Sequence, residues 1–491
     1  MKMRRKSLKP RDQLLPAQPA IAAFLPRLSA IAVCLIAASS LAAQDHPDLR
    51  LLFTGDVLLS RQVRLEIERT GGFPWEGFTQ LFHGATWVAG NLEGAVGKPT
   101  DCLPAESASP CFDIPPALIP LLSKAGFRAM GTANNHAADL GPTGLRATED
   151  ALEAEGIEVL SYQKSPRFLH LAGHSVAVIA FSNVPARDGT RAEIPSVAMR
   201  QKLRLARTMA ELVVVFVHWG SELLDWPNLD QRRAAEWLVR NGADVIVGHH
   251  PHVVQAPQCV LGKPVFYSLG NHLFDQRYPA TKEGLIADCV LRGGALRCGG
   301  IATLTPAGSA FPHLAPADSA AGLPACPVTL QPRPVVNGVA LRVVEAPNGY
   351  SIEGTPAGAR PWRSQMLPLV SAQVGKLAGG GSPDLLFTLE QHYSSIDRED
   401  GVRPYVYEVR PSGLVARWRG SALAWPLLDA TLLPGADGVL CALHRGDSFL
   451  ELQPGATGTR TAAYRWQGFG FSGVEDPRIP ERCREALSAE R

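Results

Sequence analysis

Six short groups of polar residues stand out between residues 54 and 272, and each directly follows an apolar run. They combine carboxylates, carboxamides and imidazoles, side chains that suit borderline divalent metals such as Mn, Fe and Zn. The site could hold one or two such ions, and two ions bridged by a carboxylate could activate a water and stabilise the oxygens of an in-line displacement at phosphorus. The groups are Thr54-Gly55-Asp56, Gly90-Asn91-Leu92-Glu93-Gly94, Thr132-Ala133-Asn134-Asn135-His136, His218-Trp219-Gly220-Ser221-Glu222, Gly248-His249-His250-Pro251-His252 and Tyr267-Ser268-Leu269-Gly270-Asn271-His272.

The group at residues 248–252 is the most specific of the six. Three histidines within four positions at a strand exit are rarely packing residues, and neutral imidazole is the commonest metal ligand. The other groups each have an ordinary structural alternative. The turn before Asp56 is common, Asn91 and Glu93 could form a polar strand end, and residues 134–135 could cap a helix. The groups can therefore bind metal only if the fold brings them together at one place.

The apolar runs before these groups predict an α/β fold that could bring them together. β-rich stretches alternate with helical patterns whose apolar residues recur three and four positions apart. In such folds ligands gather beyond the carboxyl ends of the strands, where the loops converge. The expected strands are 51–59, 87–92, 129–133, 176–181, 213–219, 245–247 and 265–269, with a hairpin at 285–304, and the expected helices are 116–124, 143–155 and 230–241.

In this order and spacing, over about residues 48–305, the six groups resemble the CapA family of capsule and poly-γ-glutamate biosynthesis proteins, which is similar to the calcineurin-like metallophosphatases. The resemblance implies a four-layer α/β/β/α metallophosphatase-like sandwich and a metal-dependent hydrolase site. It implies as partners an anionic envelope polymer or its precursor and capsule-synthesis membrane proteins. The alternative is a non-catalytic accessory that binds or anchors an anionic envelope polymer.

The resemblance also implies a role for individual residues. His136 takes the place of the histidine that protonates the leaving group, and Glu93 stands where a bridging carboxylate would be. The cofactor would be one or two divalent ions of Mn, Fe or Zn. The implied metal ligands are Asp56, Glu93, Asn135, His218, His250 and His252, and the additional candidates are Asn91, His249, Asn271 and Asp275.

The chain departs from the metallophosphatase pattern at three places. Position 58 of the usual Asp-x-His is Leu58, the usual Gly-Asp bridge is replaced by residues 91–93, and His272 stands where an aromatic or aliphatic residue is usual. His249 could substitute for the missing ligand. Retention of the other ligands together favours a hydrolase, whereas Leu58 favours the accessory alternative.

The N-terminus predicts export. A basic stretch is followed by an apolar run at residues 28–43 that ends in small residues, which is typical of a signal peptide. Cleavage is expected after Ala42, with Ala43 as the neighbouring option. The pair Arg4-Arg5 suits either a twin-arginine signal or an ordinary basic region. An uncleaved anchor is the alternative, so the location is periplasmic, extracellular or envelope-associated.

Charge and composition exclude other classes of protein. Residues 1–43 carry +6 of a whole-chain net charge of +2, which leaves −4 for the rest. Binding nucleic acid requires a clustered basic face, so we expect no nucleic-acid partner. With 46% hydrophobic and 19% charged residues, the chain is not mainly disordered.

Removal of the signal leaves eight cysteines, an even number that suits an oxidising compartment. Cys102 and Cys111 flank a short loop, and Cys289 and Cys298 flank a hairpin turn, so both pairs are close enough in sequence to form disulfides. The other four cysteines stay unassigned: Cys259, Cys326, Cys441 and Cys483.

The length of 491 residues predicts two or three domains. A signal peptide at 1–43 precedes a CapA-like domain at 48–305. Residues 306–383 are expected to form the remainder of the core domain and a linker rich in Pro and Gly. A small β-rich module follows at 384–491, with strands expected at 405–409, 414–418, 439–443, 449–452 and 462–466.

Aromatic residues of the C-terminal module allow two interpretations. They could form a carbohydrate-binding face, because flat aromatic surfaces stack on sugars. Alternatively they fill a small β core. The residues are Tyr405, Tyr407, Trp418, Trp425 and Trp466.

Overall fold

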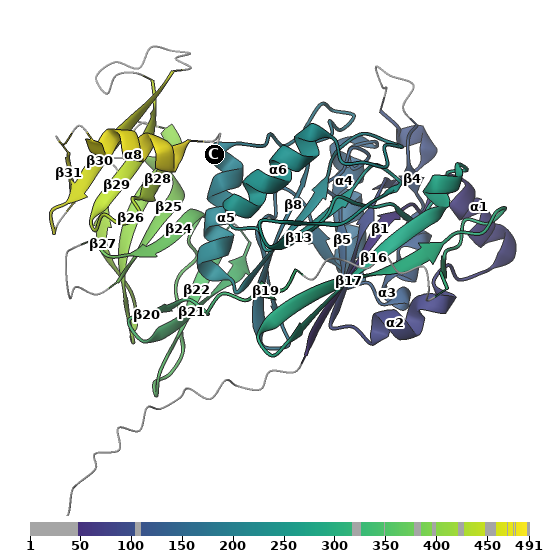
Figure 1. Cartoon of the computed structure of the whole chain (residues 1–491), viewed down its shortest axis with the longest axis horizontal. Coiled ribbons are helices and arrows are strands. Elements are labelled where there is room, and N and C mark those ends of the chain that lie inside the picture. Colours follow the sequence, from purple (N-terminus) through teal and green to yellow (C-terminus); the bar gives the residue numbers. More distant parts are fainter. Residues whose placement is uncertain are drawn as a thin grey trace, which may run out of the picture. The chain divides into compact units, whose positions relative to one another are not determined.

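The computed structural model describes residues 48–103, 110–316, 326–347, 349–377, 384–394, 399–420, 427–446, 458–468, 470–474, 476 and 478–488 (Figure 1). The expected signal peptide, the expected strand at 449–452 and Trp425 lie outside these residues. Residues from His46 onward cluster as one compact unit. The boundaries at 305 and 383 stay predictions.

The first sheet has nine strands, with β1 and β2 near its centre. β1 pairs parallel to β2 and antiparallel to β16. Every residue of β1 except Arg50 is buried, as its run of Leu and Phe predicts for a strand covered on both faces. The strands are β1 (Leu49–Val57), β2 (Trp87–Leu92), β5 (Ala129–Gly131), β6 (Glu158–Leu160), β15 (Asn271–Leu273), β16 (Glu283–Arg292), β17 (Ala295–Leu304), β18 (His313–Leu314) and β19 (Val328–Thr329).

The second sheet has six strands in the order β12-β13-β10-β9-β8-β7. Its four inner strands run parallel, and antiparallel strands close both edges. The strands are β7 (Arg167–Leu171), β8 (His174–Ser182), β9 (Leu212–His218), β10 (Val245–His249), β12 (Gln258–Val260) and β13 (Lys263–Phe266). Two small pairs accompany the sheets: β3 (Ala95–Val96) with β4 (Asp113–Ile114), and β11 (Val254–Gln255) with β14 (Ser268–Leu269).

Helices lie between these strands in the chain. Asn228 and Gln231 form a capping box at the start of α6, and Ser196 caps α5. The helices expected at 143–155 and 230–241 are present within two residues of their predicted bounds, whereas the helix expected at 116–124 is divided into a 3-10 helix and a short α-helix. The helices are α1 (Arg61–Thr70), η1 (Glu76–Phe78), α2 (Thr79–His83), η2 (Pro99–Asp101), η3 (Pro116–Leu118), α3 (Pro120–Ala125), α4 (Gly141–Ala154), α5 (Val197–Met209), α6 (Leu229–Arg240), η4 (Pro279–Lys282) and α8 (Arg478–Leu487).

Three apolar clusters hold this α/β part together. One joins the two sheets and includes Phe53 of β1 and Val214 of β9. A second packs the first sheet on α1, α3 and α4. A third packs the second sheet on α5 and α6 and includes Leu386 and Val409 of the C-terminal strands. The mixed α/β prediction is confirmed.

The rest of the described chain is rich in β structure, as predicted, and forms three four-stranded antiparallel sheets (Figure 1, green to yellow). Strand β24 pairs with β25 across the expected break at 383. The strands are β20 (Val335–Val336), β21 (Val339–Ala346), β22 (Gly349–Pro356), β23 (Trp362–Arg363), β24 (Leu369–Gly375), β25 (Leu385–Ser394), β26 (Glu399–Arg410), β27 (Gly413–Arg419), β28 (Leu427–Leu432), β29 (Val439–Arg445), β30 (Thr459–Trp466) and β31 (Phe471–Gly473).

Four disulfides join the eight cysteines that follow the expected signal. Cys102–Cys111 and Cys289–Cys298 confirm the two predicted pairs, and Cys259–Cys326 and Cys441–Cys483 account for the others. Such a set is typical of exported proteins. Within the described ranges, no helix has both the length and the apolar character needed to cross a bilayer.

Candidate metal centre

The ends of parallel strands bring the predicted groups to one edge of the two sheets. Asp56 on β1 lies beside Asn91 on β2 in the register of the first sheet. His218 on β9 lies beside His249 on β10 in the second. Because each strand leaves its sheet at this edge, the following loops converge there. Glu93 follows β2 by one residue.

A compact cluster of ligand atoms forms at this edge. Asp56, Glu93 and His218 each place one ligand atom within 4.8 Å of the other two. Both carboxylates are fully buried, and neither Glu93 oxygen has a hydrogen-bond partner within the part of the chain that the structure describes. A buried carboxylate without a partner is costly, whereas a cation beside it removes the cost. The side chains of the cluster therefore fit a divalent metal ion.

Three further predicted ligands surround this cluster. His252 places Nδ1 3.3 Å from Asp56 Oδ2 and Nε2 3.6 Å from Glu93 Oε1. His250 Nδ1 lies 3.1 Å from His218 Nε2, and Asn135 Oδ1 lies 2.7 Å from the same nitrogen. The structure thus brings together all six side chains expected to bind metal.

The loop that carries two of these histidines has an unusual backbone. His250 has φ of 97° and His252 has φ of 59°, in the left-handed region that side chains other than glycine rarely adopt. The backbone N–H of His250 donates to Asp56 Oδ2 at 3.3 Å. Such strained backbone occurs most often at functional sites, where the surroundings hold it.

Burial and charge shift the pKa values of the cluster in opposite directions. Burial, with the charge of Asp56 added, raises the pKa of Glu93 well above its usual value. Burial lowers the pKa of His218 well below its usual value and that of His250 to about 3. Burial also acts against protonation of His252, but Glu93 and Asp56 outweigh it and raise its pKa to about 10.

Asp56 completes this charge pattern. Burial acts to raise the pKa of Asp56, but the hydrogen bond and charge of His252 outweigh it and hold the pKa below its usual value. A proton on His252 thus balances the negative charge between the two carboxylates. A divalent cation could replace that proton, because it would supply the same compensation at the same place.

His136 lies at the edge of the cluster with one nitrogen already occupied. Its Nδ1 lies 2.8 Å from Asp139 Oδ2, and its Nε2 lies 3.9 Å from Glu93 Oε1. A carboxylate that accepts a proton from Nδ1 leaves Nε2 free to act toward the centre. This arrangement suits transfer of a proton to or from a ligand bound there.

The four additional candidates have different surroundings. Asn91 lies within the cluster and donates to Asp56 Oδ1 at 2.8 Å. Asn271 Oδ1 lies 2.9 Å from His252 Nδ1, so it supports that ligand. His249 Nε2 faces the carbonyl oxygen of Thr54 at 3.1 Å, and Asp275 forms a bidentate ion pair with Arg61. The structure does not bring these last two side chains into the cluster.

Sequence reasoning missed several residues that support the site. Asn134 donates to Asn91 Oδ1 and to the carbonyl of Leu92, so it holds β2 and its following loop in place. Its position in the Asn-Asn-His segment is the only signal that could have found it. Phe112 stacks on His136 with ring centroids 3.9 Å apart, and nothing in its local sequence indicates this contact.

Leu58 lies in an apolar cluster of three buried side chains beside the centre. It packs with Phe112 and Phe274, whose rings contact the imidazoles of His136 and His252. Apolar packing thus fills the position where metallophosphatases carry the histidine of Asp-x-His. The same packing excludes water from one side of the two imidazoles.

The fold and this cluster define a class: a mixed α/β protein that gathers carboxylates and imidazoles at the carboxyl ends of its parallel strands. Residues 50–276, which contain all six polar groups, match the family model of the bacterial capsule synthesis protein PGA_cap. Through this segment the chain is similar to the capsule synthesis proteins of that family.

Individual relatives are similar over the same part of the chain. The PGA biosynthesis protein CapA of Bacillus subtilis (strain 168) is 28% identical over 255 residues, 49% of this chain and 67% of that protein. The capsule biosynthesis protein CapA of Bacillus anthracis is 27% identical over 301 residues, 54% of this chain and 73% of that protein. A probable polyglutamine synthesis accessory protein of Mycobacterium tuberculosis is 27% identical over 252 residues, 45% and 65% of the two chains.

Proposed function

We propose that this chain is an exported protein of capsule or poly-γ-glutamate-type polymer synthesis, with a metal centre that hydrolyses a bond in the polymer or its precursor. The names of its relatives support the polymer. The four disulfides support export to the periplasm, the cell envelope or the exterior. The observation that carries the hydrolase is Glu93, a buried carboxylate that lies between Asp56, His218 and His252 and has no hydrogen-bond partner among the described residues.

The layers of the α/β part support kinship with metallophosphatases. One apolar cluster joins the two sheets, and each sheet packs its other face on helices. We propose that this is the four-layer α/β/β/α sandwich of that class. The strand ends that carry Asp56 and His218 then lie on opposite sheets of one sandwich and share a single site.

The residues of the centre have two kinds of role in this proposal. Asp56, Glu93, Asn135, His218, His250 and His252 hold the metal. A divalent ion in such a centre polarises a phosphoryl or carbonyl oxygen and activates water. His136 donates the proton that the departing oxygen needs, and Asp139 holds its imidazole in the required tautomer. Because apolar packing of Leu58 removes one expected ligand, we expect one ion per chain.

Metal analysis combined with hydrolysis tests this function. Protein purified with its native disulfides is loaded with Mn, Fe or Zn, and its metal content and its turnover of an aryl phosphate and an aryl phosphodiester are measured. We expect one equivalent of metal and turnover with at least one ester. Turnover should disappear in a chelator and return when the metal is restored.

The accessory alternative rests on Leu58, which removes a ligand found in working metallophosphatases. The accessory alternative predicts a different result in the same experiment. Metal-loaded protein that hydrolyses neither ester but retains poly-γ-glutamate in a pull-down assay would support a binding or anchoring role. Protein that binds no metal under any loading condition would contradict the hydrolase directly.

A further inference from the structure

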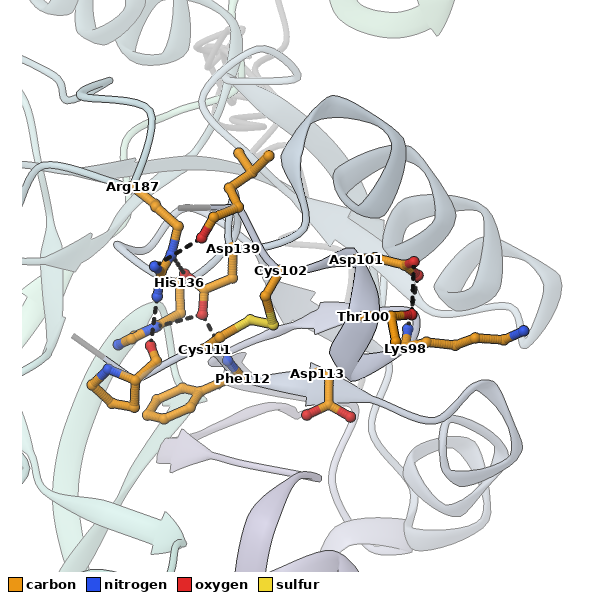
Figure 2. Close-up of a disulfide and its surroundings, with 12 residues drawn as sticks. Lys98, Thr100, Asp101, Cys102, Cys111, Phe112, Asp113, His136, Asp139 and Arg187 are labelled. Carbon is orange, nitrogen blue, oxygen red and sulfur yellow. Dashed lines mark hydrogen bonds and ion pairs between the residues drawn. A yellow bond between two sulfur atoms is a disulfide. The ribbon is translucent and has the colours of Figure 1, made fainter. Parts of the chain in front are cut away.

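The proton donor His136 is held from outside the metal centre by residues that do not bind metal. Asp139 Oδ2 contacts His136 Nδ1 at 2.8 Å and also accepts the backbone N–H of Phe112 at 2.7 Å. The Phe112 ring stacks on the imidazole. One carboxylate oxygen therefore joins the edge of the imidazole to the residue that covers its face (Figure 2).

Arg187 holds the other oxygen of this carboxylate. Its Nε donates to Asp139 Oδ1 at 3.1 Å, and the two side chains are only 6% and 1% exposed. Its two terminal nitrogens donate to the carbonyls of Leu103 and Pro110 at 3.1 and 2.9 Å. Arg187 thus pairs with the buried charge of Asp139 and ties it to the segment that carries Phe112.

The Cys102–Cys111 disulfide closes that same segment. Cys102 directly precedes Leu103, and Cys111 lies between Pro110 and Phe112. The disulfide therefore joins the two backbone segments whose carbonyls Arg187 contacts. Figure 2 shows the disulfide with Asp139, His136 and Phe112 gathered on one side of it. The position of Phe112 is therefore fixed by a covalent bond and by the guanidinium together.

We propose that Arg187 and the Cys102–Cys111 disulfide form a clamp that positions His136 for proton transfer. The clamp holds Asp139 against the edge of the imidazole and Phe112 against its face. Arg187 and the two cysteines are positioning residues, since none of them reaches the metal ligands. The inference rests on the proposed function, because it assigns an orientation to the proton donor of that reaction.

The experiment compares the clamp variants Arg187→Ala and Cys102→Ser/Cys111→Ser with two matched controls in the full-length protein. Cys289→Ser/Cys298→Ser removes a disulfide with the same sequence separation of 9 that lies in the β16–β17 hairpin. Arg204→Ala removes another largely buried arginine, 11% exposed, that pairs with Asp429 and donates to a carbonyl. Metal content is measured for every variant before turnover.

The measurement that decides is how turnover depends on the leaving group. A mispositioned proton donor slows hydrolysis most when the leaving group is poor, because a good leaving group departs without being protonated. Both clamp variants should keep their metal and lose about 10- to 100-fold in kcat on phenyl phosphate, against about threefold or less on 4-nitrophenyl phosphate. Arg187→Lys keeps the charge but not the three contacts of the guanidinium. Its kcat on phenyl phosphate should lie between those of the wild type and Arg187→Ala.

Two outcomes would overturn the clamp. Equal losses on the two esters would show that the variants damage the site in general. An equal change of leaving-group dependence in the Cys289→Ser/Cys298→Ser control would show an effect of disulfide loss as such. If Cys102→Ser/Cys111→Ser fails to fold, Phe112→Leu tests the same contact, since it removes the stacked ring and keeps an apolar side chain.

A crystal structure of each variant separates the clamp from the hydrolase. If the wild-type protein hydrolyses neither ester, the proposed reaction fails, yet the orientation of His136 is still measurable. The clamp predicts a single His136 rotamer in the wild type and both controls, and a displaced or multiple rotamer in Arg187→Ala and the Cys102→Ser/Cys111→Ser variant. An unchanged imidazole in both clamp variants would contradict it.

Discussion

Glu93 and His252 show how individual side chains of the centre depend on one another. Among the described residues no donor forms a hydrogen bond with the Glu93 carboxylate, and its shortest ion-pair contact is with His252 Nε2 at 3.6 Å. The pKa of His252 rises to about 10 because two carboxylates adjoin it. A divalent ion bound at this place would compete with the proton on His252, so metal binding should release protons.

Ligands and proton donor should respond differently to substitution. Replacement of Asp56 or His252 by Ala removes a side chain from the cluster and should cost most of the bound metal. His136→Ala should leave the metal bound and lower turnover by about 10²- to 10⁴-fold, because the imidazole lies 3.9 Å from Glu93 and donates only a proton. Metal analysis and ester hydrolysis on the three variants check this, and equal metal loss in all three would show that His136 is a ligand.

His272 should make stability depend on pH. It is buried among Phe78, Phe82 and Phe127, and neither ring nitrogen has a hydrogen-bond partner in the described ranges. Burial lowers its pKa from 6.5 to about 3. Below pH 6.5 the unfolded chain therefore binds a proton that the folded chain cannot, so this contribution to stability is lost as pH falls. The loss should approach about 1.4 kcal/mol per pH unit.

Chemical denaturation of the wild type and His272→Leu between pH 7 and pH 4, in a chelator, measures this contribution. Leucine has a similar volume and does not titrate, so the difference in free energy of unfolding between the two proteins should change in favour of the variant as pH falls. A difference that is constant across the range would show that His272 does not titrate on unfolding.

Strands and helices were predicted well where the pattern is local. The apolar run that ends at Asp56 and the periodicity at 230–241 correspond to β1 and α6 within two residues. Residues 306–383 are expected to include a linker, yet β18, β19 and β20 lie within them as two-residue strands. Such short strands are held by pairing with their neighbours, and the segment around them, rich in Pro, Ala and Ser, carries no periodic signal.

The same distinction applies to the site. The clustering of the six candidate ligands could be predicted because each stands near a strand end and within a family motif. The roles of Phe112 and Arg187 could not, since Phe112 contacts His136 and Arg187 contacts Asp139 from segments with no motif. The faces on which the aromatic residues of β26 and β27 lie could not be predicted from the sequence either. Tyr405 and Tyr407 stack on one another, whereas Trp418 pairs with Val406 and so lies on the other face of the sheet.

A glycine at the end of β10 sets the distance between this strand and its neighbour. A Cβ added to Gly248 would lie 2.1 Å from the carbonyl oxygen of Tyr267 and 2.6 Å from Trp219 Nε1. Gly248→Ala should therefore push the strand end and the following histidines outward, with a loss of about 1–3 kcal/mol in the free energy of unfolding and a loss of metal. Gly299→Ala in β17 is the control, because no neighbouring atom of the described residues lies within 4 Å of its added Cβ. Equal stability and metal content in the two variants would contradict this prediction.

At the scale of the whole molecule, the C-terminal strands share a core with the α/β part. Leu386, Tyr407 and Val409 belong to the apolar cluster that packs α5 on the second sheet. Arg204 of α5 pairs with Asp429 of β28 at 3.0 Å, and Thr208 donates to the carbonyl of Ala372 at 2.6 Å. The C-terminal sheets should therefore stabilise the domain that carries the metal centre without taking part in its chemistry.

A chain that ends after Gly375 tests this division. Every candidate ligand precedes residue 277, so the shortened chain should bind metal in the same ratio as the full chain. Its thermal midpoint should fall, because it loses three buried side chains from the shared cluster, each of which contributes about 1.5–3 kcal/mol. Leu386→Ala in the full chain is the control, since it should lower stability by a smaller amount and leave the metal in place. A shortened chain that stays folded but binds no metal would show that the C-terminal sheets complete the site.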